Sequence, residues 1–175
     1  MKNFLIVVDM QKDFVDGALG SKEALLIVDN VCEKIKNFQG EIFVTLDTHY
    51  KNYMDTLEGK KLPVPHCIKG TLGWELDSKV KAALSDKKYT IVEKATFGSV
   101  VLPDIIRIAA NGEDFTATLF GLCTDICVIS NALLLKTNFP EAKIQVDKGC
   151  CVGVTPRAHE AALLTMESCH IDIIG

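Results

Sequence analysis

Apolar runs and helical patterns alternate along the whole chain. Short runs rich in β-branched and aromatic residues are typical of strands buried on both faces, and they occur at 4–8, 41–46, 89–92, 115–121, 143–146 and 171–174. Between these runs, apolar residues recur at helical spacing, which predicts helices over 23–38, near 76–85, over 103–111, over 126–136 and from 155 onwards. This alternation predicts right-handed βαβ units and a mostly parallel six-stranded sheet between layers of helices, an α/β fold.

Local signals support several of these boundaries. Ser21 suits the N-cap of the first long helix, and Thr155 followed by Pro156 suits the start of the last one. The segment 47–75 is long, irregular and rich in proline and glycine. Loops of this length inside a compact domain are usually functional, so we expect part of the site here.

Length and charge narrow the class of protein. A chain of 175 residues without internal repeats or linkers predicts one domain over 1–175. A net charge of −4 with scattered lysines and arginines argues against nucleic acid or an anionic membrane as a partner. The N-terminal run "FLIVV" ends in Asp9 and is too short for a signal peptide, so we expect a cytoplasmic protein. An odd number of cysteines, seven, in that reducing compartment argues against a disulfide framework.

Polar side chains follow four of the predicted strands. In parallel sheets, ligands bind outside the carboxyl ends of the strands. The residues at these ends are Asp9, Gln11, Asp13, Phe14, Asp47, His49, Glu93, Lys94, Thr124, Asp125 and Cys127. An aspartate at a strand end is most often a turn residue, and a single cysteine is most often a small buried residue. The meeting of so many reactive types at one edge favours a functional site.

The stretch "GLCTDICVIS" raises the question of whether a cysteine acts as a nucleophile. We expect Cys127 in the first turn of a helix capped by Thr124 or Asp125, where free N–H groups and the helix dipole favour an anion. Such a position, with Lys94 nearby, predicts a thiol pKa well below the ordinary value. The backbone N–H of Cys123 can join that of Cys127 in facing an oxyanion.

Four motifs in order, "VVDMQKDF", "DTH…PHCIKGT", "VEKATFGS" and "GLCTDICV", resemble the cysteine hydrolases of the isochorismatase-like family, in particular the nicotinamidase branch. The resemblance continues to "VTPRAHEAAL" and covers nearly the whole chain. It implies a six-stranded parallel sheet in a three-layer α/β/α sandwich. It also implies a catalytic triad of Asp9, Lys94 and Cys127, and a cis peptide between Leu122 and Cys123.

The implied reaction is hydrolysis of nicotinamide, or a related small amide, to the carboxylic acid and ammonia. Asp9 is expected to take the thiol proton and later deliver it to the leaving amine. Lys94 is expected to stabilise the thiolate, and Cys127 to form a thioester that water hydrolyses. The backbone N–H groups of Cys123 and Cys127 would hold the oxyanion. Phe14 would offer a flat apolar wall to a ring substrate.

The resemblance also implies a divalent metal ion that holds the pyridine nitrogen. Its ligands match Asp47 and His49 of the Asp-x-His element and the later His66. The loop between them lacks the further histidine of many members, so we expect Glu58 as the fourth ligand, with Asp55 in reserve. Two imidazoles and two carboxylates suit zinc, with manganese or iron as alternatives.

Alternatives remain open at this point. A related cysteine amidohydrolase could act on a carbamoyl or ureido compound, and an inactive binding protein could share the fold. Isochorismatase itself cleaves a vinyl ether without the cysteine nucleophile, so Cys127 counts against it. A redox pair of Cys123 and Cys127 is weaker, because the spacing is not Cys-x-x-Cys. This chain lacks an aromatic residue just before "PHC", and we expect Trp74 to have a packing role only. We also expect the chain to form a homo-oligomer.

Overall fold

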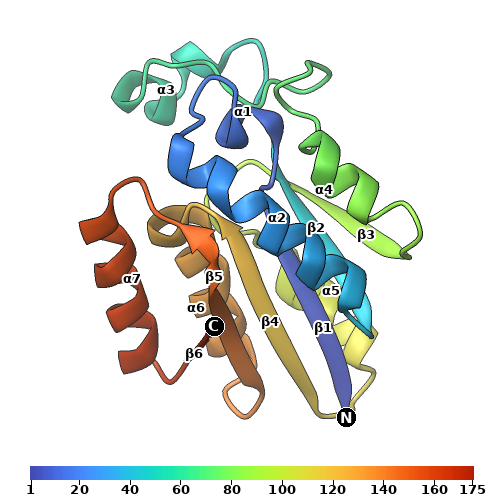
Figure 1. The fold of residues 1–175 in the computed structure, drawn as a ribbon. Coiled ribbons are helices and arrows are strands. Elements are labelled where there is room, and N and C mark those ends of the chain that lie inside the picture. The colour runs from blue at the N-terminus through green and yellow to red at the C-terminus, as the bar shows by residue number, and fades with distance from the viewer.

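The computed structural model describes residues 1–175, and its centre is one parallel sheet (Figure 1). All neighbouring strands run parallel, in the order β3-β2-β1-β4-β5-β6. The strands are β1 (Lys2–Val8), β2 (Glu41–Asp47), β3 (Tyr89–Lys94), β4 (Phe115–Leu122), β5 (Lys143–Val152) and β6 (Asp172–Ile174). The six-stranded α/β fold expected from the sequence is confirmed.

Helices cover both faces of this sheet. Helix α2 (Lys22–Asn37) packs with α4 (Ser78–Ala83) on one face, whereas α5 (Leu102–Ala110), α6 (Ile129–Asn138) and α7 (Pro156–Ser168) lie on the other (Figure 1). The remaining helical elements are short: α1 (Lys12–Val15), the 3₁₀ turn η1 (Tyr53–Asp55), α3 (Leu57–Lys61) and the π-helical turn η2 (Thr124–Val128). None of the helices combines the length and apolar character needed to cross a membrane.

The central strand β1 explains why its sequence is a continuous apolar run. It lies between β2 and β4, and every side chain from Phe4 to Val8 is buried. A strand covered by helices on both faces has no solvent side, so alternation with polar residues is lost. Ser21 and Thr155 cap α2 and α7 as expected, accepting hydrogen bonds from Ala24 N (3.0 Å) and Ala158 N (3.1 Å).

The structure differs from the sequence-based elements mainly in the loops. The segment expected to be irregular over 47–75 contains η1 and α3, and α1 follows β1 directly. Helix α3 has Thr56 as its N-cap, whose hydroxyl accepts a hydrogen bond from Gly59 N at 3.0 Å. Helices this short are stabilised by caps and tertiary contacts, which periodicity does not detect. Strand β5 also extends beyond 146 to Val152.

Candidate active site

Three reactive side chains from distant parts of the sequence meet at the carboxyl edge of the sheet. Asp9 follows β1, Lys94 ends β3, and Cys127 lies in η2 after β4. Lys94 Nζ is 2.7 Å from Asp9 Oδ2 and 3.5 Å from Cys127 Sγ. All three residues are buried. The structure therefore brings together the three residues that the sequence placed at one edge.

The backbone and side chain of Asp9 are both held in place by β2. Asp9 has a left-handed backbone conformation, with a φ of 49°. Its N–H donates to the carbonyl and the hydroxyl oxygen of Thr45, each at 3.2 Å, and the Thr45 hydroxyl donates to Asp9 Oδ1 at 2.6 Å. These contacts leave Oδ2 directed at Lys94.

Burial and charge decide the protonation of this cluster. Burial raises the pKa of the Asp9 carboxyl, and the Lys94 ammonium opposes that rise. Burial, and after it the negative charge of Asp9, raises the pKa of the Cys127 thiol, whereas the Lys94 ammonium lowers it. Burial works against the Lys94 ammonium, but Asp9, Cys127 and Asp47 together raise its pKa. The cluster thus combines a fixed ammonium, a carboxylate made more basic and a thiol that keeps its proton.

The expectation of a lowered pKa at Cys127 is therefore wrong for this structure, and the expected helix cap is absent. Neither Thr124 nor Asp125 caps the helix: Thr124 Oγ1 lies 2.8 Å from His159 Nδ1, and Asp125 Oδ1 accepts a hydrogen bond from Val154 N at 2.9 Å. The N-cap is Cys123, whose side chain makes no capping hydrogen bond. Full burial of the thiol outweighs the charge of Lys94, a balance that sequence position does not reveal.

The backbone just before Cys127 has an unusual course. The peptide between Leu122 and Cys123 is cis, as the resemblance implied. The N–H groups of Ile126 and Val128 both donate to Cys123 O at 3.1 Å, which fixes the turn. Just before the cis peptide, Gly121 has a φ of 130°, and a Cβ there would lie 2.0 Å from the carbonyl oxygen of Val8 in β1. Only glycine fits at this position.

A second cluster at the same edge can hold a metal ion. Potential ligand atoms of Asp47, His49 and His66 all lie within 4.8 Å of one another, and the three residues are buried. Asp47 Oδ2 is 2.9 Å from His49 Nε2 and 3.6 Å from His66 Nε2. Despite this short distance, His49 Nε2 makes no hydrogen bond of good geometry, and His66 Nδ1 contacts Val64 O at 2.8 Å. A buried imidazole nitrogen that faces a carboxylate without a well-formed hydrogen bond fits a divalent cation.

The carboxylate of Glu58 lies at the border of this cluster. Its Oε1 is 3.6 Å from His49 Nε2 and 3.8 Å from His66 Nε2. Asp55, the reserve candidate, is exposed and does not line the cavity described below, which leaves Glu58 as the nearer carboxylate. Sequence reasoning missed Tyr53, whose buried ring packs 4.8 Å from the His49 ring and 5.1 Å from the His66 ring, centroid to centroid.

Asp47 joins the two clusters. Its Oδ1 lies 3.1 Å from Lys94 Nζ, while its Oδ2 faces the imidazoles. Burial opposes ionisation of this carboxyl, yet the imidazoles and the Lys94 ammonium hold its pKa well below the usual range. The backbone of Asp47 is clamped by buried Gln11, which accepts from Asp47 N at 2.7 Å and donates to Asp47 O at 2.9 Å. The sequence placed Gln11 at the edge without this role.

Trp74 packs against the hydrophobic core, as expected, and its Nε1 donates to Thr48 Oγ1 at 3.0 Å.

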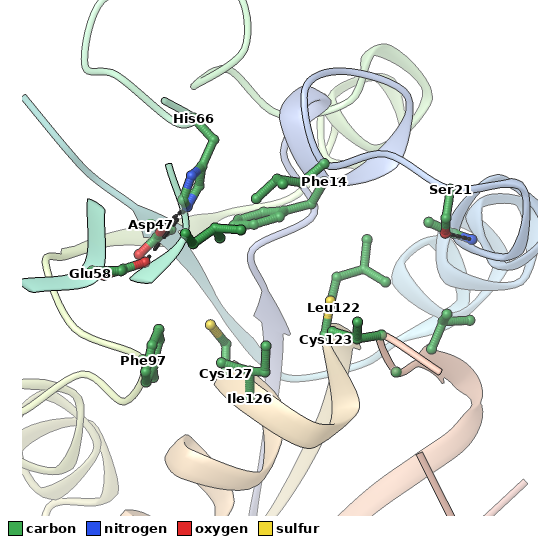
Figure 2. A pocket seen from close by; sticks show the side chains of 16 residues that line it. Phe14, Ser21, Asp47, Glu58, His66, Phe97, Leu122, Cys123, Ile126 and Cys127 are labelled. Carbon is green, nitrogen blue, oxygen red and sulfur yellow. Dashed lines mark hydrogen bonds and ion pairs between the residues drawn. The ribbon is translucent and has the colours of Figure 1, made fainter. Parts of the chain in front are cut away.

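A cavity of about 220 Å³ joins these groups. In Figure 2, Glu58 and His66 lie at one end and Ser21 at the other, with Phe14 and Cys127 between them. This volume is below the roughly 300–1,000 Å³ of drug-sized sites, so the cavity suits a small substrate. Phe14 lies 5.5 Å from the His66 ring, centroid to centroid. Half-exposed Phe97, another lining aromatic residue, was not anticipated; its place three residues after Lys94 was the available signal.

Comparisons with known proteins agree with this architecture. A relative from Bacillus subtilis (strain 168), described as an uncharacterized isochorismatase family protein PncA, is 29% identical over 143 residues, which are 76% of this chain and 78% of the relative. The crystal structure of nicotinamidase/pyrazinamidase PncA from Bacillus subtilis has a TM-score of 0.87 at 24% identity, covering 100% of both chains. That of a Pyrococcus horikoshii pyrazinamidase in complex with zinc has a TM-score of 0.83 at 27% identity, covering 99% of both. The sequence matches the model of the isochorismatase domain over residues 3–175, so the chain belongs to the isochorismatase domain family.

Proposed function

We propose that the protein is a cysteine-dependent amidohydrolase that converts nicotinamide to nicotinate and ammonia. The observation that carries this proposal is the position of the Lys94 ammonium. It contacts Asp9 at 2.7 Å, Cys127 at 3.5 Å and Asp47 at 3.1 Å, so a nucleophile, a base and a possible metal ligand share one buried cation. A structural role alone does not call for this combination around a small cavity.

The geometry supports a two-step acyl transfer. Asp9, whose pKa is raised, takes the proton of the Cys127 thiol, and Sγ attacks the amide carbon. Lys94 keeps its proton and stabilises the thiolate as it forms. The backbone N–H groups of Cys123 and Cys127 donate hydrogen bonds to the oxyanion as it develops. Asp9 then protonates the leaving amine, and water hydrolyses the thioester.

The second cluster orients the substrate. Asp47, His49, His66 and Glu58 would hold a divalent ion, and zinc fits this donor set. When bound, the ion supplies a Lewis acid that can hold a pyridine nitrogen. A neighbouring structure, the Pyrococcus horikoshii pyrazinamidase, is a complex with zinc. Phe14 and Phe97 provide apolar ring surfaces for the heterocycle.

The lining of the cavity argues against the main alternative. Many carbamoyl and ureido compounds carry a carboxylate, which needs a cationic partner when it is buried. No lysine or arginine is among the residues that line the cavity, whereas Asp47 and Glu58 are. Asp47 and Glu58 would be occupied by the ion, so the rest of the cavity lining offers an anionic substrate no cationic side chain. A neutral aromatic amide meets no such penalty.

The decisive experiment is ammonia release from a panel of amides by protein loaded with zinc. Nicotinamide and benzamide form a matched pair, since they share the amide but only nicotinamide has a ring nitrogen for the metal end. We expect turnover of nicotinamide with a kcat/KM at least tenfold above that of benzamide, and none with Cys127→Ala. Equal use of both amides would refute the metal-anchored orientation, and binding without turnover would favour an inactive binding protein. Homo-oligomer formation and a cytoplasmic location stay predictions from the sequence.

A further inference from the structure

The cavity continues past Cys127 on the side away from the candidate metal ligands Asp47, Glu58 and His66. We call this part the apolar arm and define it by Leu19, Ser21, Ala24, Leu122, Val152 and Val154. Figure 2 shows Ser21 beyond Cys123, on the opposite side from Cys127, Glu58 and His66. The arm is built from the residues before and within the start of α2 and from the ends of β4 and β5. A ring held between Phe14 and His66 would occupy the other end of the cavity (Figure 2).

The chemistry of the arm differs from that of the metal end. None of its residues is charged, and the Ser21 hydroxyl already accepts a hydrogen bond from Ala24 N at 3.0 Å. The opposite end presents Asp47, Glu58 and His66. A small apolar group is therefore the occupant that the arm would favour, because a charged group would lose its hydration without a partner.

In the proposed orientation, the leaving group is the part of the substrate that would enter this arm. The ring would lie at the metal end, with the carbonyl carbon at Cys127 Sγ and the oxygen facing the N–H groups of Cys123 and Cys127. The remaining bond of that carbon runs to the amide nitrogen. Free ammonia needs no apolar space, so the arm exceeds what a primary amide uses.

We propose that the enzyme also hydrolyses secondary amides of pyridine carboxylic acids, RCO–NHR′, in which R′ is a small alkyl group held by the apolar arm. This inference rests on the proposed nicotinamide activity and extends its substrate class. The bond between Cys127 Sγ and the carbonyl carbon forms, and the C–N bond breaks. The nitrogen keeps that electron pair and takes the proton from Asp9, so R′NH₂ leaves as a neutral amine. Water then cleaves the thioester to the carboxylic acid and restores the thiol.

The test compares four amides of pyridine-3-carboxylic acid: the primary amide, the N-methylamide, the N-propylamide and the N-carboxymethylamide. Nicotinate formation is followed by chromatography. We expect a kcat/KM for the N-propylamide no less than a tenth of that for nicotinamide, and a KM that falls from methyl to propyl. The charged N-carboxymethylamide should be at least tenfold poorer than the N-propylamide. Turnover of nicotinamide alone would overturn this inference, whereas turnover of none of them would overturn the proposed function itself.

Variants locate the effect in the arm. Val154 is 63% exposed, so Val154→Trp adds bulk at the arm with little risk to the core. Leu164→Trp is the matched control, because Leu164 is 65% exposed on α7 and does not line the cavity. We expect Val154→Trp to lower the ratio of kcat/KM for the N-propylamide over nicotinamide at least tenfold, and Leu164→Trp to leave it within twofold. An unchanged ratio in both variants would overturn the inference.

A second variant covers the case in which Val154→Trp does not fold, as judged by circular dichroism. Leu19→Ala shortens a half-buried side chain of the arm and makes room for a longer substituent. The N-butylamide should gain at least threefold in kcat/KM relative to the N-propylamide in this variant. No gain, with native circular dichroism, would count against the arm as the leaving-group site.

Discussion

Replacing Lys94 with methionine tests how the buried ammonium controls the reactivity of the Cys127 thiol. Methionine keeps a long unbranched side chain but removes the charge that contacts Asp9, Asp47 and Cys127. Lys94 is the group that opposes the rise in the pKa of the Cys127 thiol. We therefore expect Lys94→Met to raise that pKa further and to slow every reaction that needs the thiolate.

The size of the effect follows from the 3.5 Å between Lys94 Nζ and Cys127 Sγ. With an effective dielectric constant of about 20, a unit charge pair at that distance is worth roughly 5 kcal/mol. The loss of Lys94 should therefore raise the pKa of the Cys127 thiol further. Since about 1.4 kcal/mol corresponds to a factor of ten in an equilibrium constant, the thiolate fraction at a pH below the thiol pKa of both proteins should fall on the order of a thousandfold.

The assay is the rate of iodoacetamide labelling of Cys127 as a function of pH, followed by mass spectrometry of the peptide that contains it. Lys69→Met is the matched control, because Lys69 is an exposed lysine paired with Glu93 at 2.5 Å outside the cluster. Below the wild-type thiol pKa, labelling should slow by at least a hundredfold in Lys94→Met and stay within twofold in Lys69→Met. Leaving buried carboxylates without their cation should also cost about 3–5 kcal/mol of folding free energy. That loss lowers Tm by roughly 10 °C.

An unchanged labelling profile in Lys94→Met would refute the reasoning, provided that circular dichroism shows an intact fold. It would mean that the ammonium does not act on the thiol despite the short distance. Equal slowing in the Lys69 control would instead point to a change in net charge or in reagent access. Only a selective effect at Lys94 supports the electrostatic argument.

Three further predictions concern Cys127, the candidate metal ligands and the backbone at Gly121. Cys127→Ala should abolish amide hydrolysis while Cys123→Ala retains a substantial fraction, because only the backbone of Cys123 is assigned a role; equal loss in folded variants would contradict this. Elemental analysis should find at least tenfold less zinc in His66→Ala than in wild type or in His170→Ala, a surface histidine; equal contents would exclude the cluster. Gly121→Ala should lose at least about 3 kcal/mol of stability in denaturant unfolding, because the added Cβ meets a carbonyl at 2.0 Å. A loss below about 1 kcal/mol would show that the strand can shift.

Much of the fold was predictable because its determinants are local. The apolar run of β1 requires burial on both faces, and Ser21 and Thr155 cap helices through atoms three residues away. The connection of parallel strands then places all carboxyl ends at one edge. That rule alone put Asp9 and Lys94 in the same region.

The short elements were not predictable in the same way. Helix α3 has five residues, too few for a periodic pattern, and a cap at Thr56 supports it. The π-helical turn at Cys127 replaces the capped α-helix that "CTDICV" suggested, because Thr124 and Asp125 bond to the segment that follows β5. A sequence shows which side chains can cap a helix, but not which distant groups compete for them.

The sequence by itself determined the succession of strands and helices along the chain, the residue types at the strand ends and the family. Only the tertiary structure decided their chemistry. It placed Asp47 between Lys94 and two imidazoles, although 47 positions separate it from Lys94. It also buried the Cys127 thiol, so that its pKa rises where helix position predicted a fall. The physical reason is that hydrophobic periodicity and capping act over a few residues, whereas desolvation and Coulomb interactions depend on distances in space that only the packed chain defines.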